Sequence, residues 1–334
     1  MKIGVVGTSK ICEDLVKAMN KVEGVNVICS YSRSLETSQS FCNKLGIKYP
    51  FNDYDKMIES DLIDFIYIAS PNSLHYTQCK KALLANKNVI IEKPFCSNGL
   101  LAKELIDLAK SKKLFLFEAI TTIHNPYVKE IKSLIESISP IRLVQCNMSQ
   151  YSRKYDLFLN GDKPNIFNID YSGGVLMDLN VYNIHFITEL FGSPNNVSYV
   201  ANFQDNIDTS GIINLVYDNF ICNLLASKNS PSKSFIQIQG EKGYIYVDAP
   251  SSLVNSYSVN YRLNSDKNFN KVKDINVDIY HDNYQNEISH IYDIVKNKNY
   301  NICYELLDHS LVVMEVIDKA KKSQNIIFKE DLNI

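Results

Sequence analysis

Two short apolar segments separated by a helical segment constrain the fold of this chain more than any other feature. Asp64–Ala69 and Asn88–Ile91 have the apolar character of buried strands, and an amphipathic helical pattern lies between them. A strand, a helix and a second strand connected in this way make the two strands parallel. Their carboxyl ends then share one edge of the sheet, which is where open α/β sheets bind ligands.

Polar residues follow both strands at that edge. The segment Ser70-Pro-Asn72 comes after the first strand, and Glu92, Lys93 and Pro94 come after the second. The ring of Pro94 fixes its own φ and biases Lys93 toward an extended backbone, so this lysine has a defined direction. A lysine in a loop is usually a solvated surface residue. One held in this way at a ligand-binding edge is a candidate functional residue.

The N-terminus has the pattern of a dinucleotide-binding βαβ unit. Lys2–Val6 predicts a buried strand, a turn at Gly7 leads into a helix, and Val25–Tyr31 predicts the second strand. Gly7 supplies the tight turn, but Ser9 stands where a second glycine normally lets the pyrophosphate approach the backbone, and Cys12 takes the third glycine position. Taken alone, this turn is equally typical of a plain βα connection.

Helices and strands keep alternating to about residue 120, which predicts a doubly wound parallel sheet over residues 1–120. The segment Glu118–Pro126 is then expected to be the hinge into a second domain, residues 121–334. The other predicted elements of the first domain are helices over Leu35–Leu45, Tyr54–Glu59 and Leu100–Lys110, and strands over Ile47–Pro50 and Leu114–Phe117.

From about Ile141 the pattern predicts an α+β domain with a mainly antiparallel open sheet flanked by helices. Turn residues Asp218-Asn219 separate two apolar segments and predict a hairpin, as does Gly240–Gly243. The polar segment Tyr151–Ser172 is typical of a solvated loop. The remaining predictions are strands over Arg142–Ser149, between Leu253 and Val277, and over Ile326–Phe328, and helices over Tyr284–Lys296 and Tyr304–Lys322.

One predicted helix of the second domain, Gly174–Phe191, carries a candidate site. At about 100° per residue, four polar residues fall within roughly 60° of each other. They are Asp178, Tyr182, His185 and Glu189. A polar stripe on a helix usually faces water. Carboxylate, phenol and imidazole are also the groups that transfer protons, so a ligand-facing surface is an equally good interpretation.

Composition excludes several classes of function. The net charge of −2 provides no basic surface for nucleic acid, and no apolar run approaches the roughly 20 residues of a membrane span. The 8 cysteines are scattered singly, which indicates reduced thiols in a cytoplasmic protein and no structural zinc site. We therefore expect no metal, and the N-terminal segment lacks the pattern of a signal peptide.

With these residues identified, the chain resembles the Gfo/Idh/MocA family, which contains glucose–fructose oxidoreductase, inositol dehydrogenase and dihydrodiol dehydrogenase. The resemblance spans nearly the whole chain and rests on four motifs: Ala69–His75, Glu92–Pro94, Glu118-Ala119 and Gly173–Tyr182. It implies an N-terminal Rossmann domain for NAD(P) and a C-terminal domain that binds substrate and often dimerises through its sheet. It also implies that Lys93 lies near the nicotinamide and the reacting carbon.

Three positions depart from the family pattern. Ser9 replaces a fingerprint glycine, and Asn180 stands where glycine often follows the aspartate of the last motif. Tyr182 occupies a position where many members have histidine, although the dihydrodiol dehydrogenase and glucose–fructose branches also have tyrosine.

We therefore expect an NAD(P)-dependent oxidoreductase that transfers a hydride between nicotinamide C4 and an alcohol or carbonyl carbon of a sugar-like, polyol or dihydrodiol substrate. The alternative is a catalytically silent regulatory protein that binds NAD(P). The expected catalytic residues are Lys93, Tyr182 and Asp178. A phenol has an ordinary pKa of about 10, and a neighbouring ammonium and the oxidised nicotinamide favour its phenolate form.

That chemistry assigns general acid–base catalysis to Tyr182, with Lys93 as its electrostatic partner and Asp178 as an orienting group. The competing assignment makes Lys93 itself the proton carrier. The expected cofactor-binding residues are Gly7, Thr8, Ser9, Lys10, Ile11, Ser32, Arg33, Ser70, Asn72, His75, Glu92 and Lys93.

Two further expectations concern the cofactor and the assembly. The segment Tyr31–Ser34 has no acidic residue for a ribose hydroxyl, whereas Arg33 suits the 2′-phosphate of NADP. A solvated Arg33 stacked on adenine would serve NAD equally well.

The predicted sheet of the second domain concerns the assembly. Its segments Ile212–Tyr217 and Phe220–Leu225 do not alternate cleanly between polar and apolar residues, so both faces of the sheet carry apolar groups. We therefore expect a homodimer or larger homo-oligomer.

Overall fold

The computed structural model describes residues 1–262, 269–276 and 282–332, and its contacts divide the chain into two compact units. Unit 1 contains Met1–Ala119 and Asp282–Leu311, and unit 2 contains Ile120–His281 and Val312–Ile334. The first boundary lies next to the predicted one at residue 120. The predicted assignment of residues 282–311 to the second domain differs from this division, because they group with the N-terminal sheet.

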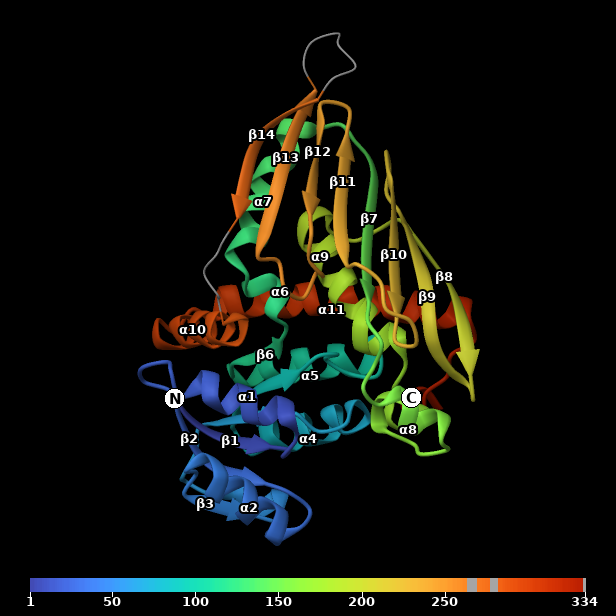
Figure 1. Ribbon diagram of the computed structural model, residues 1–334. Helices are drawn as coiled ribbons and strands as arrows, with labels where there is room; N and C mark the ends of the chain where they lie inside the picture. Colours follow the sequence, from blue (N-terminus) through green and yellow to red (C-terminus); the bar gives the residue numbers. More distant parts are fainter. Residues whose placement is uncertain (263–268, 277–281, 333–334) are drawn as a thin grey trace. The chain divides into compact units, whose positions relative to one another are not determined.

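Unit 1 contains the predicted doubly wound parallel sheet (Figure 1). All pairings in it are parallel, and four of its six strands are largely buried because helices cover both faces of such a sheet. The strands in spatial order are β3 (Tyr49–Phe51), β2 (Asn26–Tyr31), β1 (Lys2–Val6), β4 (Phe65–Ile68), β5 (Asn88–Glu92) and β6 (Leu116–Ala119). The helices are α1 (Lys10–Met19), α2 (Leu35–Leu45), α3 (Tyr54–Glu59), α4 (His75–Leu84), α5 (Gly99–Lys112), α10 (Asn283–Lys296) and the first half of α11 (Tyr300–Ser323), with a 3₁₀ turn η1 (Asn72–Leu74).

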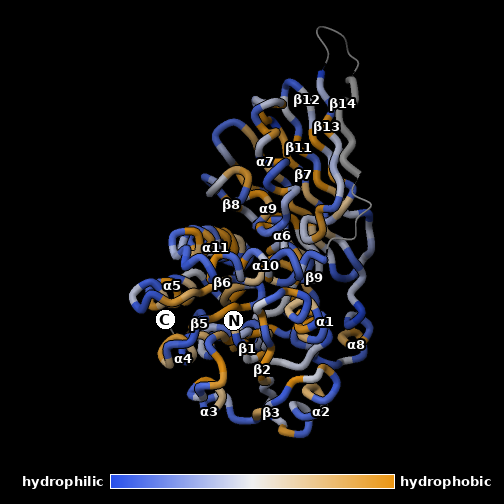
Figure 2. Tube along the Cα trace, turned by 90° about the vertical axis from the view of Figure 1, so that its left-hand side faces the viewer, coloured by the Kyte–Doolittle hydropathy of each residue, from blue (hydrophilic) through white to orange (hydrophobic). Residues whose placement is uncertain are grey.

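Local signals explain where these helices begin and end. The side chains of Ser34 and Asn98 accept hydrogen bonds from backbone amides in the first turns of α2 and α5. Gly46 ends α2 in the left-handed conformation, with φ of 71°. In Figure 2 the tube carries both hydrophobic and hydrophilic residues along the helices, as amphipathic helices require.

Unit 2 contains a mainly antiparallel sheet of eight strands among the described residues. Its one parallel pair joins β10 and β7, in the register Leu224 to Cys146. The strands in spatial order are β14 (Phe269–Asn276), β13 (Ser256–Arg262), β12 (Gly243–Val247), β11 (Phe235–Gly240), β7 (Ile141–Ser149), β10 (Ile221–Ser227), β9 (Ile207–Val216) and β8 (Asn196–Gln204). The helices are α6 (Thr121–His124), α7 (Pro126–Ile138), α8 (Tyr155–Leu159), α9 (Val181–Phe191) and the end of α11, with short turns η2 (Asn165–Phe167), η3 (Ile169–Tyr171), η4 (Leu176–Asn180) and η5 (Lys329–Leu332).

The structure corrects two predictions in unit 2 and adds one strand. The segment predicted as a solvated loop, Tyr151–Ser172, contains α8 and two 3₁₀ turns, and it buries Tyr155, Phe158 and Phe167 in a cluster with Ile207. Because the segment is mostly polar, its composition does not indicate that these aromatic residues are buried. Ile326–Phe328, predicted as a strand, is not one. Strand β8 was not predicted from the sequence. Val277, the last residue of the predicted strand region that begins at Leu253, lies outside the described residues. The two predicted hairpins are confirmed as β9–β10 and β11–β12.

Within the described part of the chain, no helix is both long and apolar enough to cross a membrane. In the same residues no group of three or more metal-ligating side chains is found.

Candidate active site

The carboxyl ends of β1 and β4 bring two predicted loops together. Ile68 pairs with Val6, and the turn at Gly7 lies directly against the backbone that follows β4. Gly7 has φ of +117°, and a Cβ added there would lie 2.8 Å from the carbonyl oxygen of Ala69. Only glycine therefore fits this turn, which packs tightly against the loop that follows β4.

Helix α1 begins directly after this turn. Ser9 is its N-cap residue, yet the Ser9 side chain makes no capping hydrogen bond and its hydroxyl lies 3.2 Å from the thiol of Cys12. The first amides of a helix have no intrahelical acceptor and attract anions. Thr8 and Ile11 flank the turn half-buried, and Lys10 is exposed, with its ammonium 2.6 Å from Asp14.

The end of β2 carries the residues expected at the adenosine ribose. Ser32 is half-buried, and its amide donates to the carbonyl of Phe51. Arg33 is exposed immediately beyond it. Ser34 caps α2, and its hydroxyl oxygen accepts a 3.4 Å bond from the amide of Thr37.

The loop after β4 holds Ser70 and Asn72 half-buried, and the Ser70 hydroxyl donates to Gln78 at 2.7 Å. His75 is fully buried, with Nδ1 2.9 Å from the carbonyl of Pro94 and Nε2 3.0 Å from the carbonyl of Ser70. Burial lowers the pKa of His75. The ring connects the loops that follow β4 and β5, and its expected contact with the cofactor stays a prediction.

The motif after β5 divides between the interior and the surface. Glu92 is 9% exposed and accepts a hydrogen bond from the Tyr67 hydroxyl at 2.6 Å, and its expected contact with the cofactor stays a prediction. Burial raises the pKa of Glu92, and the charge of Lys93 acts in the opposite direction. Burial and the charges of Glu92 and Glu118 raise the pKa of Glu287, on α10. Lys93 is half-exposed, and the Lys93–Pro94 bond is cis.

The remaining predicted residues of unit 1 fit a dinucleotide. Helix α1 presents its amino end after the Gly7 turn, and Arg33 adds a cation at the end of the neighbouring strand.

The last motif, in unit 2, does not form one regular helix. Leu176–Asn180 is a π-helical turn, and α9 starts only at Val181. The predicted stripe assumed 100° per residue throughout, and a π turn breaks that period. Asp178 and Tyr182 are half-buried, His185 is fully buried and Glu189 pairs with Lys132 at 2.8 Å. The four residues therefore do not share one ligand-facing stripe.

Two groups that sequence reasoning missed contact the motif that carries Asp178. The ammonium of Lys228 lies 2.8 Å from Asp178 Oδ2, and Lys228 is 1% exposed. Asp208, also buried, accepts hydrogen bonds from the Tyr199 hydroxyl at 2.7 Å and from the Leu176 amide at 2.8 Å. The only sequence signal for Lys228 is its position just after a predicted strand, Phe220–Ala226.

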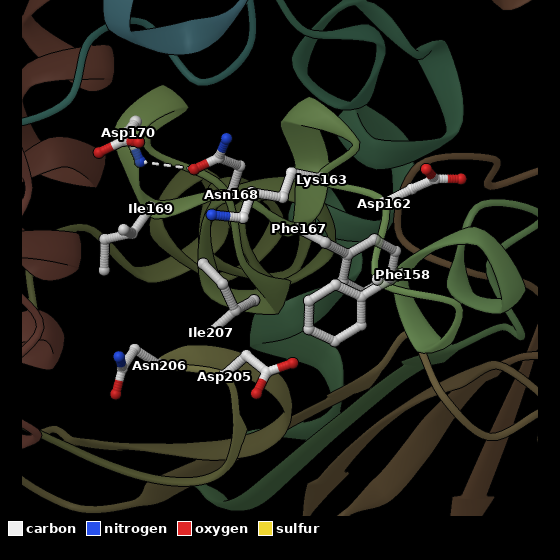
Figure 3. Close-up of a pocket in the computed structure, with 11 residues that line it drawn as sticks. Phe158, Asp162, Lys163, Phe167, Asn168, Ile169, Asp170, Asp205, Asn206 and Ile207 are labelled. Carbon is white, nitrogen blue, oxygen red and sulfur yellow. Dashed lines mark hydrogen bonds between the residues drawn. The ribbon is translucent and has the colours of Figure 1, made fainter.

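Unit 2 also contains a cavity of about 400 Å³, shown in Figure 3. The rings of Phe158 and Phe167 stack on one side of it, and Asp205 and Ile207 line it from the β8–β9 turn. None of its lining residues belongs to the predicted catalytic or cofactor set.

Comparison with known proteins gives independent evidence. Residues 1–119 match the family model described as oxidoreductase family, NAD-binding Rossmann fold, and residues 128–246 match the GFO/IDH/MocA C-terminal domain. The chain is 31% identical over 337 residues to the scyllo-inositol 2-dehydrogenase (NADP(+)) IolU of Bacillus subtilis, covering 99% of each protein. It is 35% identical over 249 residues to the uncharacterized oxidoreductase YgjR of Escherichia coli, covering 74% of this chain and 76% of that protein.

Solved structures share the fold. The 3-ketoreductase KijD10 from Actinomadura kijaniata, in complex with NADP and TDP-benzene, superposes with a TM-score of 0.84 at 19% identity, covering 97% of both chains. Levoglucosan dehydrogenase in complex with NADH and levoglucosan superposes with a TM-score of 0.81 at 18% identity over the same share of each chain. The two family matches and the full-length relative show that this chain belongs to the Gfo/Idh/MocA family of NAD(P)-dependent oxidoreductases.

Proposed function

We propose that this protein is an NADP(H)-dependent dehydrogenase or reductase that acts on a hydroxyl or carbonyl carbon of a polyol or sugar-like small molecule. The observation that carries the proposal is the carboxyl edge of the parallel sheet, where the Gly7 turn abuts the loop after β4 and Lys93 follows the adjacent strand. The full-length similarity to a scyllo-inositol 2-dehydrogenase supports the polyol class. A dihydrodiol remains within the same substrate chemistry, and dihydrodiol dehydrogenases are among the relatives.

The geometry of unit 1 supports the following assignment of the cofactor residues. Backbone amides from Gly7 to Ile11 hold the pyrophosphate at the amino end of α1. Ser32 and Arg33 hold the 2′-phosphate, and Ser70, Asn72 and Lys93 lie on the nicotinamide side. When bound, the nicotinamide donates or accepts the hydride at C4.

The chain itself supplies orientation and proton transfer. Tyr182 exchanges a proton with the substrate oxygen, Lys93 donates a hydrogen bond to that oxygen and stabilises negative charge, and Asp178 orients the substrate through its hydroxyls. In the competing assignment Lys93 carries the proton and Tyr182 is a wall of the substrate site.

An absorbance assay at 340 nm tests the proposal. The purified protein is mixed with NADP⁺ or NAD⁺ and with inositols, sugars or dihydrodiols, and with NADPH or NADH and dicarbonyls. We expect turnover with at least one polyol or sugar and faster turnover with NADP(H). Tight binding of NADPH without turnover of any substrate would favour the regulatory alternative.

A further inference from the structure

Lys228 is a buried lysine that the chemistry described so far does not use. It follows β10, and its ammonium touches Asp178 Oδ2 at 2.8 Å and donates to the carbonyl of Ile166 at 3.0 Å. The ammonium also lies 4.4 Å from the centroid of the Phe167 ring. Burying a lysine is costly unless its charge is paired and hydrogen-bonded, and here a carboxylate, a carbonyl and an aromatic face compensate for the lost water.

The backbone at Lys228 is fixed from both sides. Its amide donates to the carbonyl of Thr209 at 2.8 Å, and its carbonyl accepts from the amide of Ser152, also at 2.8 Å. The ammonium therefore projects from a rigid point, between strand β9 and the segment that leads into α8.

Asp178 differs from Lys228 in its access to solvent. The Asp178 side chain is 24% exposed, compared with 1% for Lys228, so this aspartate pairs with a buried cation and is itself in contact with solvent. The π turn that carries Asp178 is attached to the sheet by the bond from the Leu176 amide to Asp208. The charge of Lys228 also acts on Asp208, so a single ammonium serves two carboxylates around this turn.

We propose that Lys228 is a positioning residue: its buried ammonium fixes the Asp178 carboxylate in one orientation, so that the accessible part of Asp178 accepts a hydrogen bond from a substrate hydroxyl. The inference rests on the proposed function. It adds a chemical requirement for the substrate, because a carboxylate held against a cation acts as an acceptor and selects molecules that offer a hydroxyl donor.

The chain contains a matched control for Lys228. Lys321, also in unit 2, is 4% exposed, pairs with Asp331 at 2.9 Å and lies 4.6 Å from the centroid of the Phe328 ring. It has the same burial, the same type of ion pair and the same aromatic contact, but its partner aspartate is not a proposed site residue.

A double-mutant cycle tests the inference. We expect Lys228→Met to lower kcat/KM by about 10²-fold, the scale of a misplaced orienting group, and Lys321→Met to change it by less than about threefold. In an Asp178→Asn background, Lys228→Met should cost less than about threefold more, because its effect passes through Asp178. Equal effects of the two lysine variants, or full multiplicativity of Lys228→Met with Asp178→Asn, would overturn the proposal. Lys228→Gln, which keeps a donor for Ile166, replaces Lys228→Met if that variant does not fold.

A crystal structure of the Lys228→Met variant provides a readout that does not depend on activity. We expect the Asp178 carboxylate to turn or to become disordered while α9 stays in place. An unchanged Asp178 would refute the positioning role. If wild-type protein turns over no substrate with either nicotinamide, the proposed function fails, and the crystal structure still decides whether Lys228 fixes Asp178.

Discussion

Arg33 is the residue that decides the expected choice of cofactor. It is exposed at the end of β2, where the 2′ position of the adenosine ribose lies in a Rossmann domain. An arginine–phosphate pair is a charge-assisted bond, so Arg33→Ala should weaken NADPH binding by about 10- to 100-fold and leave NADH binding nearly unchanged. Titration of both cofactors by fluorescence measures this. Tighter binding of NADH by the wild-type protein would contradict the prediction.

Tyr182 is the residue that separates the two assignments of the proton. It lies half-buried against Met148, Val175 and Leu179. Tyr182→Phe keeps this packing and removes only the hydroxyl, so we expect kcat to fall by about 10²–10⁴-fold with unchanged binding of NADPH. Tyr217→Phe is the control, because the Tyr217 hydroxyl donates to the carbonyl of Gly192 and has no proposed role.

The opposite outcome has a defined meaning. If Tyr182→Phe keeps kcat within about threefold of wild type while Lys93→Met abolishes turnover, Lys93 carries the proton and the two roles are exchanged.

Single residues also show what the sequence could predict. Lys93 and Gly7 were identifiable because a proline and a tight turn constrain their backbones, which is local information. The burial of His75 and Glu92 depends on carbonyls and a phenol contributed by other segments. Lys228 was missed for the same reason, because its partner lies 50 residues away in sequence.

At the scale of elements, the π turn at Leu176–Asn180 depends on the glycine before it. Gly174 has φ of +115°, and a Cβ there would lie 1.8 Å from Asp208 Oδ1. Gly174→Ala should therefore lower the free energy of unfolding by about 3 kcal/mol, combining backbone strain with a steric clash. Gly46→Ala, with φ of +71° and open space around it, should lose only about 1–2 kcal/mol. Urea unfolding followed by circular dichroism measures the loss of unfolding free energy in both variants. Equal losses would show that the Asp208 side chain moves aside to make room for the new methyl group.

Asp208 makes the stability of the same region depend on pH. Burial raises the pKa of Asp208 to about 6, so the folded chain holds this proton more tightly than the unfolded chain does. Its stabilising contribution is complete below pH of about 4 and is lost as the pH rises through about 6. Between pH 4.5 and 7.5, wild type should lose about 2 kcal/mol of unfolding free energy relative to Asp208→Asn. Parallel pH profiles of the two proteins would contradict this assignment.

The elements themselves were predictable to different degrees. The parallel sheet was predicted almost strand by strand, because its buried strands are short apolar runs between clear helices. Strand β8 and the segment Tyr151–Ser172 were not, because their apolar residues are interspersed with polar ones and become a pattern only when packed. No pattern in the sequence predicts the π turn, and its different angle per residue changes which of the four polar residues share a helix face.

At the scale of the whole molecule, the sheet of unit 2 presents an apolar face, and we propose that a second copy of the chain covers it. Helices α7 and α9 contact β12 and β7, and on the other face Val200, Ile212, Val216 and Ile221 are 63%, 42%, 39% and 47% exposed. The register pairs Ile212 with Val200 and Ile221 with Val216. Between these pairs runs a row of amides, in which Asn223 Nδ2 donates to Asn214 Oδ1. Two apolar rows around a polar row suit a two-fold symmetric interface.

Light scattering tests this assembly through one position. Stable dimers commonly bury about 1,600 Å² in total, an area that a sheet face can supply, so we expect wild-type protein at twice the chain mass of 38.1 kDa. Ile212→Lys should give monomers, because an unpaired ammonium in the interface is unfavourable. Leu100→Lys, at a 61% exposed leucine on α5 of unit 1, should leave the mass unchanged. A wild-type mass of one chain at micromolar concentration would refute the interface, and a dimer that survives Ile212→Lys would place it on another surface.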